Sequence, residues 1–68
     1  MINDFCERLK EIRTKNKITL RQLAQALNVN FSTISRWENG EITPSIDYLK
    51  QICDYFNISA DYLLGRID

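Results

Sequence analysis

The stretch LRQLAQALNVNFSTISRWENG holds two helical patterns of apolar residues with almost no chain between them. The apolar positions are Leu20, Leu23, Ala24 and Leu27, followed by Ile34 and Trp37. Asn28 follows the first pattern, and asparagine tolerates the left-handed backbone conformation at which many helices end. Only Val29 and Asn30 then remain before the second pattern begins. Such a short connection predicts two helices that meet at roughly a right angle, the arrangement of a helix-turn-helix.

Helical spacing elsewhere predicts three more helices and no strand, so we expect an all-α fold of five short helices in a single compact domain over residues 1–68. The expected helices cover about 4–15, 20–27, 31–39, 44–56 and 60–64. A chain of this length buries only a small core, so nearly every apolar residue must contribute to it. The inner side of the fourth helix is expected to consist of Ile46, Leu49, Ile52, Cys53 and Phe56.

Capping residues mark the ends of these helices. Thr19, with Gln22 three residues later, forms a capping box at the start of the second helix. The other expected N-caps are Asn3, Asn30, Ser59 and, beside Pro44, either Thr43 or Ser45. The expected helix stops are Asn16, Asn28, Asn57, Gly40 and Gly65.

The two cysteines, Cys6 and Cys53, do not form a CxxC motif, and the chain has no histidine, so a zinc ion would lack ligands. Both cysteines fall on apolar helical sides, and we expect them to be small buried hydrophobes. No metal or cofactor is expected. The sequence also lacks a glycine-rich phosphate loop and a nucleophile clustered with a base, which argues against an enzyme.

No apolar run approaches the roughly 18 residues of a membrane-spanning helix. The first ten residues, MINDFCERLK, lack the apolar region of a signal peptide. These two observations predict a cytoplasmic protein without a membrane partner.

The net charge is zero, but the charges are divided along the chain. Residues 1–36 hold seven basic and three acidic residues, a net charge of +4, whereas residues 37–68 hold two basic and six acidic residues, a net charge of −4. This division suggests a basic surface that could meet a polyanion, although solvated surface charge without a partner would give the same count.

The segment from Leu20 to Trp37 resembles the helix-turn-helix of the lambda-repressor and Cro-like family, also called the xenobiotic response element family. Asn28 stands where that family often has glycine. The similarity extends over nearly the whole chain, through ERLKEIR, ITLRQLAQALNVN, STISRWENG and YLKQICDYFNIS. The resemblance implies a five-helix domain whose third helix enters the major groove of double-stranded DNA.

The residues that this resemblance places against base edges are Asn30, Phe31, Ser32, Ser35 and Arg36. Arg36 could donate two hydrogen bonds to guanine, or it could clamp a phosphate or remain solvated. Asn30 could bind adenine, but its role as an N-cap competes. Phe31 could meet a thymine methyl group or pack against its neighbours.

The resemblance and the positive end of the second helix together predict the phosphate contacts. The residues are Arg13, Lys15, Lys17, Thr19, Arg21, Gln22 and Asn39. Two departures weaken the prediction, because Leu20 replaces a common glutamine and Glu41 stands where a basic residue is frequent. Arg13 and Glu38 resemble a family pair that either aims Arg13 at the DNA backbone or serves only as a structural salt bridge.

Tyr48, Tyr55 and Tyr62 lie in the acidic half and predict either a protein interface or a cover for the small core. The resemblance implies that such an interface would form a twofold dimer. The combined interpretation is a sequence-specific DNA-binding transcriptional regulator, a repressor that binds a palindromic operator as a homodimer. The alternative is a protein-binding module, such as an antitoxin or anti-repressor, that uses the acidic C-terminal surface.

Overall fold

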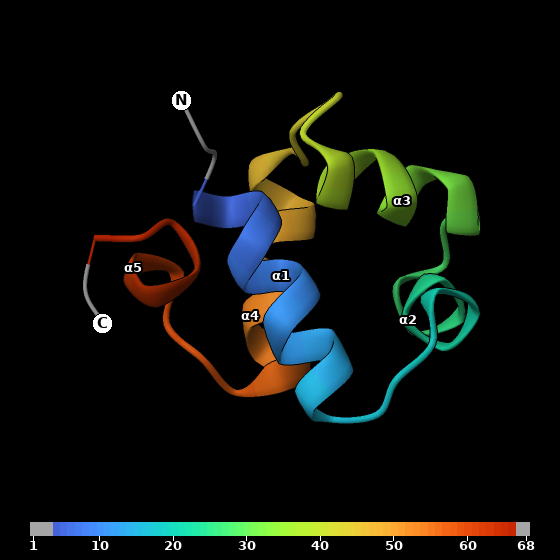
Figure 1. Cartoon of the computed structure of the whole chain (residues 1–68), viewed down its shortest axis with the longest axis horizontal. Coiled ribbons are helices and arrows are strands. Elements are labelled where there is room, and N and C mark those ends of the chain that lie inside the picture. The colour runs from blue at the N-terminus through green and yellow to red at the C-terminus, as the bar shows by residue number, and fades with distance from the viewer. Residues whose placement is uncertain (1–3, 67–68) are drawn as a thin grey trace.

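Five helices make up the part of the chain that the computed structural model describes, residues 4–66. They are α1 (Asp4–Lys15), α2 (Leu20–Leu27), α3 (Phe31–Asn39), α4 (Ile46–Phe56) and α5 (Ala60–Leu63), as Figure 1 shows. The all-α prediction is confirmed, and the bounds of the first three helices agree with the expected ones. Helix α4 begins at Ile46 and not at the expected residue 44, since Ser45 is its N-cap, and α5 ends one residue early, since Leu64 is its C-cap.

Side-chain caps start three of these helices. The Thr19 hydroxyl accepts a hydrogen bond from the Gln22 N–H at 3.0 Å, and the Gln22 side-chain oxygen accepts one from the Thr19 N–H at 2.8 Å. Ser45, rather than Thr43, caps α4, and Ser59 caps α5. Asn30 occupies the N-cap position of α3, but its side chain makes no capping hydrogen bond. The cap predicted at Asn3 lies outside the described residues.

Residues in the left-handed conformation end the helices, as expected at Asn28, Asn57 and Gly40, whose φ angles are 58°, 57° and 78°. The expectation for Asn16 is wrong, because Lys17 adopts the positive φ instead. The Asn16 side-chain amide donates to the Ile12 carbonyl at 2.7 Å, which satisfies the end of α1 without a left-handed turn there. The chain therefore turns one residue later.

The core takes one completely buried side chain from each helix. These residues, each with 0% exposure, are Leu9, Leu23, Ile34, Ile52 and Leu63. Trp37 is 2% exposed and fills the space between them. This use of every helix is what a small core requires.

Cys6 and Cys53 are free, buried thiols, which confirms their prediction as core residues. Burial raises the pKa of the Cys53 thiol above its ordinary value, and the neighbouring Asp54 carboxylate raises it further. The group therefore stays protonated, a state unsuited to nucleophilic attack or metal binding.

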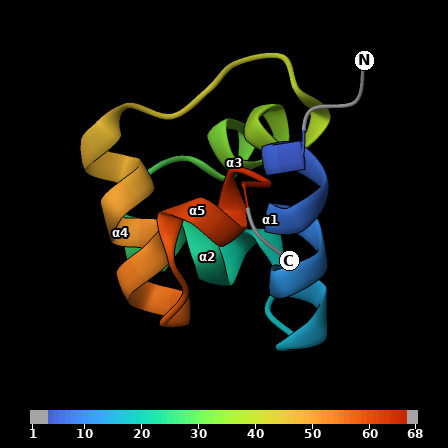
Figure 2. The ribbon, with the colours of Figure 1, turned by 90° about the vertical axis from the view of Figure 1, so that its left-hand side faces the viewer.

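Ile46 departs from the predicted core, since it is 84% exposed. It is the first residue of α4, and this end of the helix stands clear of its neighbours at the end of the long connection from α3 (Figure 2). Helical spacing alone cannot show that the first turn of a helix extends beyond the elements that would cover it.

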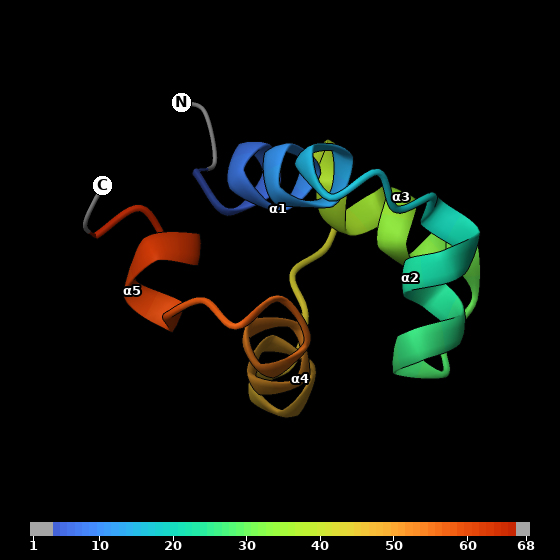
Figure 3. The same ribbon diagram turned by 90° about the horizontal axis from the view of Figure 1, so that it is seen from below.

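Contacts between helices close a ring around the core. Helix α1 packs on α5, α5 on α4, α4 on α2, α2 on α3, and α3 on α1. Figure 3 shows α1 and α4 on opposite sides, with α2 and α5 at the two ends between them. Within residues 4–66, no helix is both long and apolar enough to span a membrane.

An ion pair joins α1 to the last turn of α3. Arg13 Nε donates to Glu38 Oε2 at 2.6 Å, and Nη2 donates to Oε1 at 3.1 Å. Arg13 Nη1 donates to the Ile18 carbonyl at 2.8 Å. The side chains of Arg13 and Glu38 are 13% and 6% exposed, so this pair is a largely desolvated structural contact.

The left-handed backbone at Asn28 should tolerate glycine but not a β-branched residue. We expect Asn28→Val to lower the free energy of unfolding by about 1–2 kcal/mol, and Asn28→Gly to leave it nearly unchanged. Gln25→Val, at an exposed position in α2, is the control and should cost no more than about 0.7 kcal/mol. Chemical denaturation measures all three, and equal losses for both valine variants would contradict the strain argument.

Removing one partner of the ion pair leaves a buried charge without compensation. Glu38→Gln should therefore lower the free energy of unfolding by about 3 kcal/mol. The control is Arg66→Ala, which breaks the exposed Arg66–Asp61 pair and should cost less than about 1 kcal/mol. Thermal melts compare the two, and a small effect at Glu38 would show that α3 does not depend on this pair.

Candidate nucleic-acid interface

Helix α3 divides cleanly into a buried and an exposed side. Ile34 and Trp37 face the core, whereas Phe31, Ser32 and Arg36 are exposed. Ser32 and Arg36 lie one helical turn apart, so they share the outer side of the helix. The outer side thus carries an aromatic ring and a short hydroxyl group at its start and one long cation a turn later.

Ser35 and Asn39 contact each other and are less available than the sequence suggests. Ser35 is half-buried, and its hydroxyl accepts a long hydrogen bond of 3.5 Å from the Asn39 side-chain amide. A predicted base-contacting residue and a predicted phosphate-contacting residue are thereby linked along α3. The two roles remain predictions.

Asn30 is exposed immediately before α3, and its amide is not used as a cap. The competition expected between capping and base contact is therefore absent. Two hollows of about 400 and 380 Å³ flank this residue, and both are lined by Val29 and Asn30.

Arg21 and Phe31 bring α2 and α3 together at the same edge. The Arg21 guanidinium carbon lies 5.0 Å from the centre of the Phe31 ring, within the range of a cation–π contact. The Phe31 ring remains 48% exposed. The two alternatives for Phe31 are thus compatible, because the ring packs on a neighbour and still faces outward.

The N-terminus of α2 presents the remaining predicted phosphate contacts. Lys17, Thr19, Arg21 and Gln22 are all exposed there or in the connection before it, whereas exposed Lys15 is the last residue of α1 and also lines a hollow with Tyr62. The capping box uses the Gln22 side-chain oxygen, which leaves its NH₂ group as a donor. Arg13 differs from this group, because each of its three side-chain nitrogens already donates to Glu38 or Ile18.

The three tyrosines of the acidic half have different surroundings. Tyr48 packs on Trp37, with ring centres 5.6 Å apart, and Tyr62 lies beneath the Arg8 guanidinium, 4.6 Å away. Tyr55 is 44% exposed and contacts Phe56 edge-on. Tyr48 thus covers the core and Tyr62 contacts Arg8, whereas Tyr55 is the most exposed of the three.

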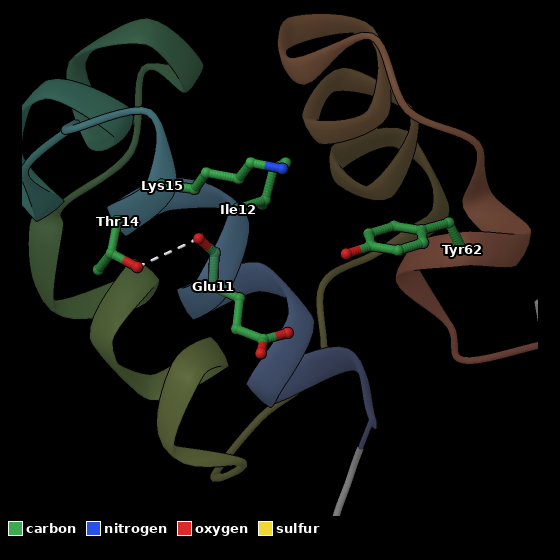
Figure 4. Close-up of a pocket in the computed structure, with 5 residues that line it drawn as sticks. All are labelled: Glu11, Ile12, Thr14, Lys15 and Tyr62. Atoms are coloured by element: carbon green, nitrogen blue, oxygen red, sulfur yellow. Dashed lines mark hydrogen bonds between the residues drawn. The ribbon is translucent and has the colours of Figure 1, made fainter. Parts of the chain in front are cut away.

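A separate hollow of about 450 Å³ lies between α1 and α5 (Figure 4). Its lining consists of Glu11, Ile12, Thr14, Lys15 and Tyr62. The Thr14 hydroxyl is already hydrogen-bonded to the carbonyls of Lys10 and Glu11. Across residues 4–66 there is no cluster of three or more His, Cys, Asp or Glu side chains that could hold a metal ion.

Sequence reasoning missed Gln25 and Arg8. Gln25 lies one turn after Arg21 and lines the same hollow as Phe31, a position that helical spacing from Arg21 could have indicated. Arg8 donates to the Tyr62 carbonyl at 2.9 Å and joins α1 to α5. No local pattern signals that contact, because 54 positions separate the two residues.

Comparison with known proteins places this geometry in a family. A family model described as Helix-turn-helix matches residues 9–63. The HTH-type transcriptional activator BcrR of Enterococcus faecalis is 39% identical over 62 residues, which are 91% of this chain and 30% of that protein. The cryptic phage CTXphi transcriptional repressor RstR of Vibrio cholerae is 33% identical over 60 residues, or 88% of this chain and 54% of that protein.

A solved structure supports the same assignment. A transcriptional regulator from Listeria innocua superposes with a TM-score of 0.87 at 31% identity, covering 94% of this chain and 60% of that one. The chain therefore spans about a third to three fifths of the length of these relatives. Since the matching model covers most of the chain and the fold agrees, the chain belongs to the Cro/lambda-repressor-like helix-turn-helix family.

Proposed function

We propose that this chain binds double-stranded DNA sequence-specifically through α3 and thereby regulates transcription. The observation that carries the proposal is the division of α3 into a buried side and an outer side that presents Phe31, Ser32 and Arg36. Short side chains let a helix approach base edges closely in the major groove, which admits an α-helix. Membership of a family whose relatives are named as transcriptional regulators supports this function.

Base contacts come from the start of α3 and the turn that follows. Arg36 donates two hydrogen bonds to a guanine, and Asn30 pairs with an adenine through its uncommitted amide. Ser32 and Ser35 bond to more than one kind of base. Phe31 meets a thymine methyl group, for which its exposed ring provides an apolar surface.

Phosphate contacts come from the N-terminus of α2, where N–H groups and the positive helix end favour an anion. The contributing side chains are Lys15, Lys17, Thr19, Arg21 and Gln22, with Asn39 after α3 and Arg13 beside Glu38. Leu20 packs against the core instead of reaching the backbone, and exposed Glu41 repels it. Binding by one copy is therefore weak.

Two copies compensate for this weakness by binding two half-sites of a palindromic operator. The exposed part of Tyr55, together with the exposed edges of Tyr48 and Tyr62, provides the dimer surface. The regulator acts as a repressor by occupying its operator. BcrR is named an activator and RstR a repressor, so the relatives include proteins that activate and proteins that repress transcription.

The rival function is a protein-binding module that uses the acidic surface. The packing of Tyr48 on Trp37 and of Tyr62 under Arg8 reduces the aromatic surface available for any protein contact, so the preference for DNA binding rests on the outer side of α3. Selection from a randomised duplex library separates the two functions. Recovery of a symmetric sequence supports the operator-binding dimer, whereas a library that shows no enrichment rejects it and favours the rival.

Salt dependence tests the phosphate contacts. The logarithm of the binding constant should fall linearly with the logarithm of salt concentration, by about 0.9 per neutralised phosphate. Lys17→Ala should weaken binding to all duplexes alike and reduce the slope by about 1 per binding site. Lys50→Ala, which removes an exposed cation from α4, is the control and should change neither quantity. Fluorescence anisotropy measures both, and a flat salt profile would reject the basic surface.

Arg36 tests the base contacts. Arg36→Ala should weaken binding to the selected operator by about 1–3 kcal/mol and relax the preference at one base pair in each half-site. Arg36→Lys should restore part of the affinity and less of the preference, because an ammonium group lacks the planar fork. In a dimer the affected pairs are symmetric, with half-site centres about 34 Å apart or a multiple of that.

Repeating the randomised selection with each variant measures these changes. If Arg36→Ala lowers affinity but selects the same sequence, Arg36 is a phosphate clamp. Specificity would then depend on Asn30, Phe31, Ser32 and the shape of the DNA.

A further inference from the structure

Arg21 and Phe31 make the one aromatic–cation contact that joins α2 to α3 within residues 4–66. Arg21 is exposed, and among these residues it makes no ion pair and no hydrogen bond through its side chain. Its 5.0 Å contact with the Phe31 ring is therefore what orients the guanidinium in the fold. Among residues 4–66, Arg21 is the cation that lies over this ring.

A hollow beside the pair gives the ring an alternative position. The hollow, of about 380 Å³, is lined by Arg21, Ala24, Gln25, Val29, Asn30 and Phe31. Ala24 and Val29 give it an apolar floor on which a phenyl ring could fold down. A ring folded there would withdraw from any partner that meets the outer side of α3.

The chemistry of arginine allows one side chain to hold the ring and bind a phosphate together. A guanidinium stacks through its flat face, whereas its N–H donors lie in its plane and point outward from the edge. A cation–π contact made through that flat face therefore leaves the donors available. A lysine ammonium keeps the charge but has no flat face to stack.

We infer that Arg21 is a positioning residue for specificity: its guanidinium holds the Phe31 ring outward, where the ring contacts the 5-methyl group of a thymine. The inference rests on the proposed function and adds to it that the base preference of α3 is set in part from α2. The same guanidinium binds a neighbouring phosphate through its edge, so base preference and backbone binding share one side chain.

Replacing thymine by deoxyuridine tests this contact directly, because the change removes only the methyl group. The probe is the duplex recovered by randomised selection with the unmodified protein, in which each thymine is replaced in turn at both symmetric positions. One replacement should weaken binding about four-fold per half-site, the value of one buried methyl group. Phe31→Ala should bind both duplexes equally.

Arg21→Lys should also lose the discrimination between thymine and deoxyuridine, while its salt slope stays that of the unmodified protein. Arg21→Gln is neutral but has a planar amide. It should retain part of the discrimination between thymine and deoxyuridine, and its binding constant should depend less steeply on salt concentration. Lys17→Ala is the matched control: it removes a nearby cation, weakens binding and leaves the discrimination intact. Thermal melts establish that each variant is folded, and either Arg21 variant suffices for the test.

The outcomes separate the inference from the proposed function. If selection with the unmodified protein enriches no sequence, the proposed function fails and the inference with it. If the operator is found and Arg21→Lys or Arg21→Gln discriminates as strongly as the unmodified protein, Arg21 is a phosphate clamp and the inference alone is overturned. The inference is also overturned if no thymine of the operator passes both tests. In those tests, its replacement by deoxyuridine weakens binding of the unmodified protein, and Phe31→Ala abolishes that difference.

Discussion

At Asn28 the backbone enters the left-handed region, with φ 58° and ψ 46°, and this one residue sets the direction of α3. The Val29 N–H bonds back to the Ala24 carbonyl at 2.9 Å, so the turn closes directly onto α2. Because only three residues separate the end of α2 from the start of α3, α3 has little freedom in how it crosses α2. Ile34 and Trp37 then meet the core, and the opposite side of α3 necessarily faces outward.

The far end of α3 is held by a different kind of interaction. The Arg13–Glu38 pair ties its last turn to α1, and Gly40 ends it with a φ of 78° close to Cys6. A side chain added at Gly40 would approach the Cys6 sulfur at 3.2 Å, so the chain passes tightly over α1 there. Because other contacts fix both ends of α3, the residues on its outer side contribute little to the stability of the fold. Asn30 is the clearest example, because it occupies the N-cap position but its side chain makes no capping hydrogen bond.

Local signals in the sequence predicted most of the fold, because caps and helical spacing depend on residues within a turn of one another. The capping box at Thr19 and the stop at Asn28 are of this kind. The errors depend on surroundings that spacing cannot reveal: Ile46 projects beyond the helices that would bury it. The Arg21–Phe31 contact likewise joins two helices whose relative position follows only once the turn is built. The residues of the candidate site were thus predictable individually, but their contacts were not.

The division of charge along the sequence overstates the basic surface of the folded chain. Arg13 is committed to Glu38 and Ile18, and Arg8 lies over Tyr62, so two of the seven cations in residues 1–36 serve the fold first. The exposed cations near α2 and α3 are fewer, and Arg21 among them also contacts Phe31. A polyanion partner would therefore gain only a few charge contacts from one copy, and each contact contributes a limited, salt-sensitive share of the affinity. Under the proposed function, the arrangement of base contacts on α3 and the joining of two copies must supply the remainder, which makes the orientation of Phe31 and Arg36 more important than the net charge.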